Sequence, residues 1–316
     1  MKKRKLGNSD LETAPLAFGG NIFGWTVDEQ SSFKLLDAFA GAGFNLIDTA
    51  DTYSRWARGN KGGESETIIG NWMKQRGNRD KVIVATKLGG DMGDGKKGLS
   101  KKYIFSAVED SLSRLQTDYI DLYQSHYDDL STPVEETIDA YAELIKQGKV
   151  KAIGASNLSP ERLKQSVDYS NSKNLPRYET LQPHYNLYDR EGFEKNYQQY
   201  CLANGISVIP YFSLASGFLT GKYRSESDLS KSARGRGIKK YLNDRGYLII
   251  DTLDEIAVYN NTKPASVALA WLMTRETVAA PIASATTIEQ LEDLINAKNL
   301  QLDKDALELL DKASEY

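Results

Sequence analysis

The sequence is poor in the residues that build disulfide and metal sites. Its 316 residues include one cysteine, Cys201, and two histidines, His126 and His184. A single thiol excludes a disulfide framework within the chain and a cysteine-rich metal site, and two imidazoles argue against a zinc site made of several histidines. We therefore expect no bound metal, and we expect a reducing compartment, the cytoplasm.

Long apolar runs and an excess of one charge are also missing. No stretch of about 18 apolar residues occurs, so we expect no membrane-spanning helix. The basic start, Met1 to Lys5, lacks the apolar segment of a secretory signal. Forty basic and 43 acidic residues give a net charge of −3, unlike the clustered basic surface of a nucleic-acid-binding protein. We expect neither nucleic acid nor membrane as a partner, and the oligomeric state stays open.

Apolar β-rich runs alternate with helical patterns along nearly the whole chain. We expect strands at 15–19, 44–48, 82–87, 119–124, 150–155, 179–182, 206–211 and 278–283. We expect helices at 30–41, 64–76, 101–115, 134–146, 160–169, 193–203, 247–260 and 288–297. Ser100 and Ser159, the latter followed by Pro160, are typical helix N-caps, and Gly148 and Gly205 are typical C-terminal stops.

Eight strands, each followed by a helix, predict an α/β protein built as one (β/α)8 TIM barrel over residues 1–316, a single domain. A doubly wound open sheet is the main competitor. Residues 1–14 should form a hairpin across the barrel floor that turns at Gly7-Asn8-Ser9. Residues 214–246 should form a long loop between the seventh strand and its helix, and loops of this length are usually functional or mobile.

Four polar residues fall at the expected ends of three successive strands: Asp48, Tyr53, Lys87 and His126. Asp48 and Lys87 are 39 residues apart, as are Lys87 and His126. One strand-plus-helix unit takes about that length, so the three should share one rim of the barrel. There a tyrosine can give a proton, an ammonium can lower its pKa, a carboxylate can hold the ammonium and a histidine can orient a substrate oxygen.

Gly93, Gly95 and Gly98 spell the G-x-G-x-x-G pattern of dinucleotide-binding folds. In that pattern the turn comes straight off the strand and the glycines run into the helix. Here the strand ends six residues earlier, at Lys87, and Ser100 caps the next helix later. We interpret the glycines as a flexible loop at the barrel mouth.

Seven segments, in order, resemble those of the aldo-keto reductase superfamily, and most of all its bacterial branch that is similar to the potassium-channel β subunit. They are LIDTADTY (46–53), TK (86–87), LYQSH (122–126), GASN (154–157), LQPHYNLYDR (181–190), YFSLASGFLTGKY (211–223) and SATTIEQLEDL (284–294). The resemblance implies a TIM barrel that reduces aldehydes or ketones to alcohols with a nicotinamide cofactor. Tyr53 would be the acid, Lys87 its activating cation, Asp48 the partner of Lys87, and His126 the group that positions the carbonyl.

The resemblance also implies cofactor contacts. Ser156, Asn157 and Gln182 would hold the nicotinamide carboxamide, since Asn and Gln supply both donors and acceptors, and Tyr211 would stack on its ring. Further contacts are expected at Gly20, Asn21, Asp48, Phe212, Ser213, Leu214, Gly217, Lys222, Arg234, Ser284, Thr286, Gln290 and Asp293.

The last of these segments carries no base, whereas many NADPH-specific relatives have Lys and Arg there. NADP(H) is the favoured cofactor, with NAD(H) as the alternative, and we expect modest discrimination between them. Aromatic pocket walls for a small carbonyl substrate are expected at Trp25, Trp56, Tyr127 and Tyr185. Two other functions stay open at this point: a nucleotide-binding module that senses redox state with slow turnover, and a barrel hydrolase with paired carboxylates.

Overall fold

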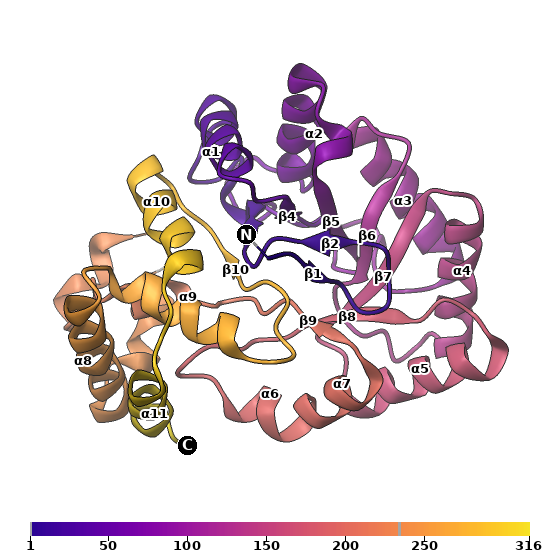
Figure 1. Ribbon diagram of the computed structural model, residues 1–316. Helices are drawn as coiled ribbons and strands as arrows, with labels where there is room; N and C mark the ends of the chain where they lie inside the picture. The colour runs from indigo at the N-terminus through magenta and orange to yellow at the C-terminus, as the bar shows by residue number, and fades with distance from the viewer. Residues whose placement is uncertain (1, 233–234) are drawn as a thin grey trace.

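The computed structural model describes residues 2–232 and 235–316. In it, one parallel sheet runs in the order β10-β3-β4-β5-β6-β7-β8-β9 (Figure 1). Its strands are β3 (Ala17–Gly19), β4 (Leu46–Asp48), β5 (Ile83–Leu88), β6 (Ile120–Ser125), β7 (Val150–Ser156), β8 (Tyr178–Gln182), β9 (Ser207–Val208) and β10 (Ile282–Ala283).

Backbone hydrogen bonds between the β9 region and the segment that leads into β10 close this sheet into a barrel. The Val208 amide donates to the Thr277 carbonyl at 2.8 Å, and the Ala279 amide donates to the Val208 carbonyl at 2.8 Å. The Ile282 amide also donates to the Pro210 carbonyl at 3.0 Å. The predicted TIM barrel is therefore confirmed, and the open doubly wound sheet is excluded.

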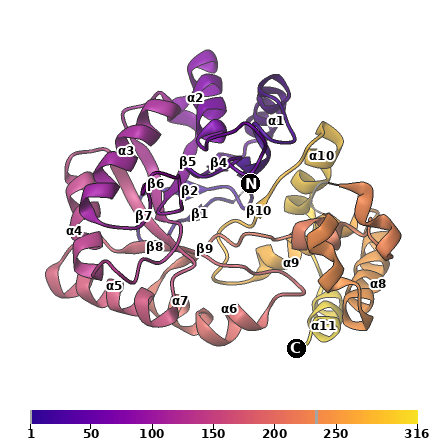
Figure 2. The same ribbon diagram turned by 180° about the vertical axis from the view of Figure 1, so that it is seen from behind.

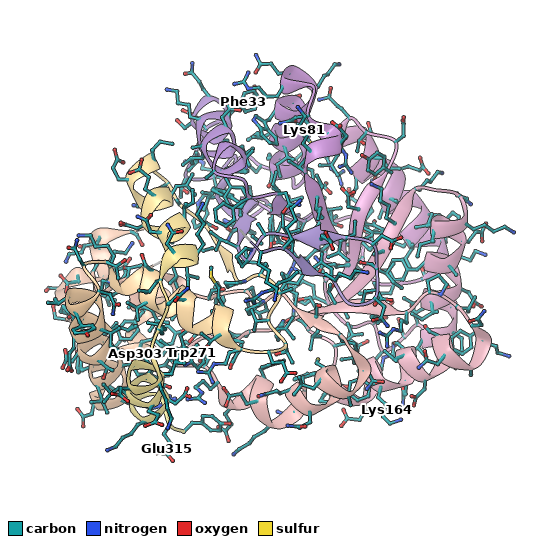
Figure 3. All side chains as sticks on the ribbon, viewed as in Figure 1. Phe33, Lys81, Lys164, Trp271, Asp303 and Glu315 are labelled. Atoms are coloured by element: carbon teal, nitrogen blue, oxygen red, sulfur yellow. The ribbon has the colours of Figure 1, made fainter. Side chains whose placement is uncertain are left out.

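The helices pack around the sheet (Figure 2). They are α1 (Glu29–Gly41), α2 (Glu64–Arg76), α3 (Lys101–Leu115), α4 (Val134–Lys146), α5 (Pro160–Lys173), α6 (Glu191–Asn196), α7 (Gln198–Asn204), α8 (Asp244–Tyr259), α9 (Pro264–Thr274), α10 (Ile288–Asn296) and α11 (Lys304–Ala313). The two predicted serine caps form: Ser100 accepts from the Tyr103 amide and Ser159 from the Arg162 amide. Exposed charges such as Lys81 and Lys164 lie on the outside (Figure 3).

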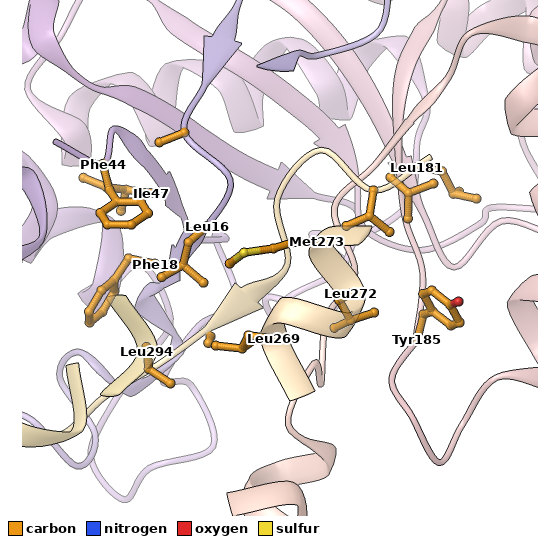
Figure 4. Packing of buried hydrophobic residues seen from close by; sticks show 14 of the residues in the cluster. Leu16, Phe18, Phe44, Ile47, Leu181, Tyr185, Leu269, Leu272, Met273 and Leu294 are labelled. Atoms are coloured by element: carbon orange, nitrogen blue, oxygen red, sulfur yellow. The ribbon is translucent and has the colours of Figure 1, made fainter. Parts of the chain in front are cut away.

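Helix α9 was not expected, because it is apolar on every side and shows no helical alternation of polar and apolar residues. Every residue from Ala265 to Met273 is buried. It lies next to β10, with α8 outside it (Figure 1). The helix expected at 247–260 therefore corresponds to α8, and the insertion after the seventh strand extends beyond 214–246 to include it. Leu269 and Leu272 of α9 pack among buried side chains of the barrel wall (Figure 4).

The predicted N-terminal hairpin is confirmed. β1 (Arg4–Lys5) pairs antiparallel with β2 (Glu12–Thr13), and the turn between them starts at Gly7, whose φ is 60°. Leu6 and Leu11 join a buried cluster with side chains from the barrel strands. The hairpin thus covers one end of the barrel (Figure 1).

The long segment after β9 is made of short 3-10 helices. They are η3 (Ala215–Thr220), η4 (Glu226–Lys231) and η5 (Gly235–Tyr241). Three more 3-10 helices lie elsewhere in the chain: η1 (Gly20–Ile22), η2 (Arg79–Lys81) and η6 (Ala297–Asn299). Tyr241 at the end of this segment stacks on Phe218 at 5.2 Å between ring centroids. The segment is therefore anchored at both ends by buried aromatic rings.

Two glycines in neighbouring helices give a matched test of the packing. A methyl group on Gly70 of α2 would lie 2.3 Å from the Arg114 carbonyl oxygen, whereas one on Gly41 of α1 meets nothing within 4 Å. We expect Gly70→Ala to lower the free energy of unfolding by about 1–3 kcal/mol through overpacking. Gly41→Ala should leave it unchanged or raise it by up to about 1 kcal/mol. Urea unfolding measures both, and equal effects of the two substitutions would contradict the close approach of α2 and α3.

Candidate active site

Three strand ends bring the predicted polar residues to one rim. Asp48 is the last residue of β4. Lys87 lies near the end of β5, where it pairs with Gln124 of β6. His126 directly follows β6, and its amide donates to the Leu88 carbonyl at 2.8 Å. The equal spacing in the sequence thus corresponds to equivalent positions on successive parallel strands.

The Lys87 ammonium is the centre of this cluster. Its Nζ lies 2.8 Å from Asp48 Oδ2, 2.7 Å from the Tyr53 hydroxyl oxygen and 2.7 Å from the Thr49 carbonyl oxygen. The Tyr53 hydroxyl also donates to Asp48 Oδ2 at 3.1 Å. Lys87 has no exposed surface and Asp48 is 2% exposed, so lysine, aspartate and tyrosine form a closed hydrogen-bonded triangle beneath the rim.

Burial and the neighbouring cation determine the charge state of His126. Burial lowers the pKa of His126 well below its ordinary value, and the positive charge of Lys87 lowers it further. The imidazole is therefore neutral at pH 7. Its ring centroid lies 6.0 Å from that of Tyr53, and it stacks on Tyr127 at 4.5 Å. Burial also lowers the pKa of Lys87, while Asp48 acts in the opposite direction.

A chain of side-chain hydrogen bonds continues from the triangle along the rim. Gln182 Nε2 donates to Asp48 Oδ1 at 2.8 Å, and Ser156 Oγ donates to the Gln182 carbonyl at 2.9 Å. Asn157 Nδ2 donates to the His126 carbonyl at 2.9 Å, and the Tyr211 hydroxyl donates to Asn157 Oδ1 at 3.0 Å. The Asp48 carboxylate and the amide side chains of Asn157 and Gln182, all predicted from the sequence as site residues, thus lie in one set of hydrogen bonds along the rim.

Tyr211 begins the next part of the site. One face of its ring stacks on His184, with centroids 5.4 Å apart and planes 18° apart. After it the backbone turns sharply, with positive φ at Phe212, Ser216 and Gly217. Lys222 follows, and a methyl group on Gly217 would lie 3.4 Å from its Cε atom.

Beyond the loop, the final segment makes its own contacts. Ser284 Oγ lies 2.7 Å from the Gly19 carbonyl oxygen and 3.0 Å from Asn21 Oδ1, so its single proton is shared between these two acceptors. Gln290 Oε1 accepts from both the amide and the hydroxyl of Thr286, at 2.9 and 3.0 Å. These bonds fix the turn that leads from β10 into α10.

One cavity of about 770 Å³ connects all these parts. The predicted site residues that line it are Asn21, Asp48, Tyr53, Trp56, His126, Tyr127, Ser156, Asn157, Gln182, Tyr211, Phe212, Ser213, Leu214, Gly217, Lys222, Ser284, Thr286, Gln290 and Asp293. This volume is in the range of cofactor and ligand sites.

Some predicted residues lie elsewhere. Tyr185 was expected in the pocket wall, but it is 1% exposed, packs on Trp271 and donates to Glu194 at 2.8 Å. It belongs to the buried hydrophobic cluster (Figure 4), because its ring packs against Phe193 of α6 and Trp271 of α9. Gly20 is buried, and its carbonyl accepts from Ser65.

Three further residues stand apart from the lining. Lys87 lies behind Asp48 and Tyr53, and acts on the cavity only through them. Trp25 contacts Trp56 edge-to-face at 5.6 Å and does not itself line the cavity. Arg234 lies outside the described residues.

The cavity also has walls that sequence reasoning missed. They are Gly19, Ile22, Thr26, Ser216, Thr220, Lys231, Ser232, Lys263, Ala265, Ile282, Ala283 and Leu294. Ser216 and Thr220 fall inside the segment 211–223 and could have been included with it. Lys263 is the N-cap of α9, so missing that helix also meant missing this lysine.

A second buried cluster lies behind the triangle. Glu66, with no exposed surface, bonds Arg114 at 2.7 Å and accepts from Thr86. Asp51 is 2% exposed, and both its carboxyl oxygens have no hydrogen-bond partner among the described residues. Burial, reinforced by the charge of Glu66, raises the pKa of Asp51 to about 8. Its carboxyl group is therefore mostly protonated at pH 7.

The sequence is similar to a family model and to several known proteins. A sequence model described as the aldo/keto reductase family matches residues 15–315. The chain is 32% identical to protein tas of Escherichia coli (strain K12), over 97% of this chain and 96% of that protein. It is 33% identical to the oxidoreductase YrpG of Bacillus subtilis (strain 168), over 98% and 95%, and 40% identical to aldo-keto reductase YhdN of the same strain, over 66% and 60%.

Two further features concern the part of the chain that the structure describes. None of the helices there has both the length and the hydrophobicity to cross a membrane. Across residues 2–232 and 235–316, no group of three or more His, Cys, Asp or Glu side chains is arranged to hold a metal ion.

Because the pKa of Asp51 is raised in the folded protein, the free energy of unfolding should depend on pH. Between about pH 4 and pH 8 the unfolded chain releases this proton before the folded protein does, so the free energy of unfolding falls as the pH rises. Asp51→Asn removes the effect. We expect the Tm of this variant, relative to the unmodified protein, to increase steadily from pH 4 to pH 8.

Thermal unfolding at several pH values measures this difference. Asp10→Asn, at an exposed position, controls for the loss of one negative charge. A Tm difference that stays constant, or that shrinks as the pH rises, would show that Asp51 is ionised in the folded protein.

Proposed function

Because the chain belongs to the aldo/keto reductase family, we propose that it is an NADP(H)-dependent oxidoreductase that reduces aldehydes or ketones to alcohols, with Tyr53 as the proton donor. The observation that carries the proposal is the 2.7 Å contact between the Lys87 ammonium and the Tyr53 hydroxyl. This contact lies at the wall of the cavity of about 770 Å³.

Tyr53 needs help to act as an acid at neutral pH, because a free tyrosine has a pKa of about 10. The adjacent Lys87 cation favours the phenolate that remains after the proton has left. Lowering the pKa of a phenol by two units corresponds to about 2.7 kcal/mol of differential interaction. Asp48 holds the ammonium at 2.8 Å, so the cation cannot move away as the phenol loses its proton.

The neutral His126 has a different task. Burial disfavours the protonated imidazole, the nearby Lys87 cation disfavours it further, and both lower the pKa of His126. A neutral ring can donate one hydrogen bond to a carbonyl oxygen without competing as an acid. Tyr53 and His126 both line the cavity, so a substrate oxygen between them would be oriented by His126 and protonated by Tyr53.

The cavity fits a nicotinamide cofactor. Its walls carry amide and hydroxyl groups beside the triangle, an aromatic ring at Tyr211, a tight loop at Gly217 and lysines farther along. When bound, the reduced cofactor supplies the hydride. Ser156, Asn157 and Gln182 would hold its carboxamide, and the face of Tyr211 opposite His184 would support its ring.

The substrate would enter past exposed aromatic side chains. Trp56 is 53% and Tyr127 is 49% exposed, and both line the cavity near Tyr53. Such walls suit a small carbonyl compound with a flat apolar part. The assembled triangle favours turnover over a regulatory module. It also disfavours a hydrolase with paired carboxylates, because Asp48 is neutralised by Lys87.

Tyr53→Phe tests the acid directly. The substitution removes the hydroxyl and keeps the ring, so we expect kcat for 4-nitrobenzaldehyde to fall by about 10²–10⁴-fold. Cofactor affinity, measured by fluorescence titration, should change little. Tyr127→Phe removes a hydroxyl from the same cavity as a control and should keep most of the rate. Comparable rates for the Tyr53 variant and the unmodified protein would rule Tyr53 out as the proton donor.

The lowered pKa of His126 makes a further prediction about the dependence of rate on pH. Since the ring stays neutral, kcat/KM between about pH 5.5 and 7.5 should show no step that belongs to a histidine. His126→Asn should lower kcat/KM by a similar factor at every pH in this range. A step near pH 6.5 that disappears in this variant would mean that His126 titrates during turnover.

A further inference from the structure

We propose that Thr52 is a positioning residue for His126: its hydroxyl group donates a hydrogen bond to Nδ1 of the imidazole and so keeps the ring proton on Nε2. The inference rests on the proposed function and deepens it, because it concerns how His126 would meet a carbonyl oxygen. The observation behind it is a contact of 3.5 Å between Thr52 Oγ1 and His126 Nδ1.

The position of a single proton decides what His126 can do. A neutral imidazole has one N–H group and one bare nitrogen, and the hydrogen bond made by one nitrogen fixes the state of the other. His126 is neutral because burial, reinforced by the Lys87 cation, lowers its pKa. A carbonyl oxygen can only accept a hydrogen bond. The nitrogen that faces the substrate must therefore carry the proton, and the other nitrogen needs a donor.

The other contacts of His126 fix the place of the ring but not the place of its proton. Its amide donates to the Leu88 carbonyl, its carbonyl accepts from Asn157, and its ring stacks on Tyr127 with the planes 22° apart. Within residues 2–232 and 235–316, Thr52 is the one side chain at hydrogen-bond distance from a ring nitrogen of His126. Nε2 is thus the nitrogen left to meet a ligand in the cavity that His126 lines.

The direction of the bond follows from counting donors and acceptors. If Nδ1 donated to the threonine oxygen, the ring would present the lone pair of Nε2 to the cavity, and a carbonyl oxygen there would meet no donor. If the hydroxyl group donates, its own proton, the Nδ1 lone pair and the carbonyl oxygen are all satisfied. A contact of 3.5 Å is at the outer limit for a hydrogen bond, and contacts between catalytic groups often shorten once the substrate binds.

Backbone pairing and a neighbouring glycine hold the Thr52 hydroxyl group in place. The Asp51 amide donates to the Lys87 carbonyl at 3.1 Å, which continues the pairing of β4 with β5 up to the residue before Thr52. A methyl group on Gly90 would lie 2.6 Å from the Thr52 Cγ2 atom, so the threonine methyl group packs directly against Gly90. Because a side chain branched at Cβ is stiff at χ1, this packing keeps the hydroxyl group beside His126.

Nitrogen-15 NMR of the full chain, labelled on histidine, measures the tautomer directly. The sequence has only two histidines, so His126→Asn identifies the ring signals of His126 by their loss. In the unmodified protein at pH 7 we expect Nε2 to be protonated and Nδ1 to be bare. Thr52→Val keeps the shape of the side chain and removes the donor. It should shift the Nδ1 signal towards that of a protonated nitrogen, because the ratio of the two tautomers changes by about 2–10-fold, the net value of one hydrogen bond.

Turnover gives a second readout. With 4-nitrobenzaldehyde as substrate, Thr52→Val should lower kcat/KM by about 2–10-fold, for the same reason. Thr52→Ser keeps the hydroxyl group, so it should retain most of the rate and the His126 signals of the unmodified protein. Thr67→Val makes the same chemical change at an exposed position of α2 and should alter neither the signals nor the rate.

Three results would overturn the assignment: a proton on Nδ1 of His126 in the unmodified protein, His126 signals that Thr52→Val leaves unchanged, or a Thr52→Ser variant as impaired as Thr52→Val. The last result would mean that the packing of the threonine methyl group matters and the hydroxyl group does not. The NMR measurement needs no turnover. A protein with the expected tautomer that reduces no carbonyl compound would therefore refute the proposed reaction and leave the role of Thr52 standing.

Discussion

The buried ion pair between Lys87 and Asp48 is the constraint on which the rest of the site depends. An ammonium group with no exposed surface costs several kcal/mol to desolvate unless hydrogen-bond acceptors surround it. Here a carboxylate, a phenol oxygen and a carbonyl oxygen lie within 2.8 Å of it. These acceptors come from β4 and the turn after it, so the lysine is satisfied only if β4 and β5 pair in this register. The fold and the chemistry are therefore specified by the same contacts.

The single positive charge of Lys87 also sets the states of its neighbours. Together with burial, which has the larger effect, it lowers the pKa of His126 and so keeps the imidazole neutral. On its other side lies the second buried cluster, where Arg114 compensates Glu66. Asp51 is the acid left without a cation of its own, so burial keeps its proton in place. The site thus holds one cation and one anion in contact with the phenol, and the other groups near it are neutral or paired. This arrangement concentrates the field of the ammonium on Tyr53.

Much of this could be predicted from sequence because it is local. Apolar strand runs, serine caps and the 39-residue spacing are all read within short segments, and they located the barrel and the rim that carries Asp48, Lys87 and His126. The errors concern residues whose position depends on packing between distant segments. Helix α9 lacks an amphipathic pattern because it is covered on every side, and Tyr185 turns inward to meet α6 and α9. Neither fact is encoded in the neighbouring residues.

The two ends of the cavity differ in the same way. The end that carries Asp48, Lys87 and His126 is assembled from strand termini, whose geometry is fixed by backbone pairing. The other end is assembled from helix starts and the long segment after β9, and the lysines that line it, Lys222, Lys231 and Lys263, come from separate parts of the chain. Surface charges at such positions can change without affecting the hydrogen bonds of the sheet. The contacts at that end can therefore change independently of the hydrogen bonds that hold Asp48, Tyr53 and Lys87 together.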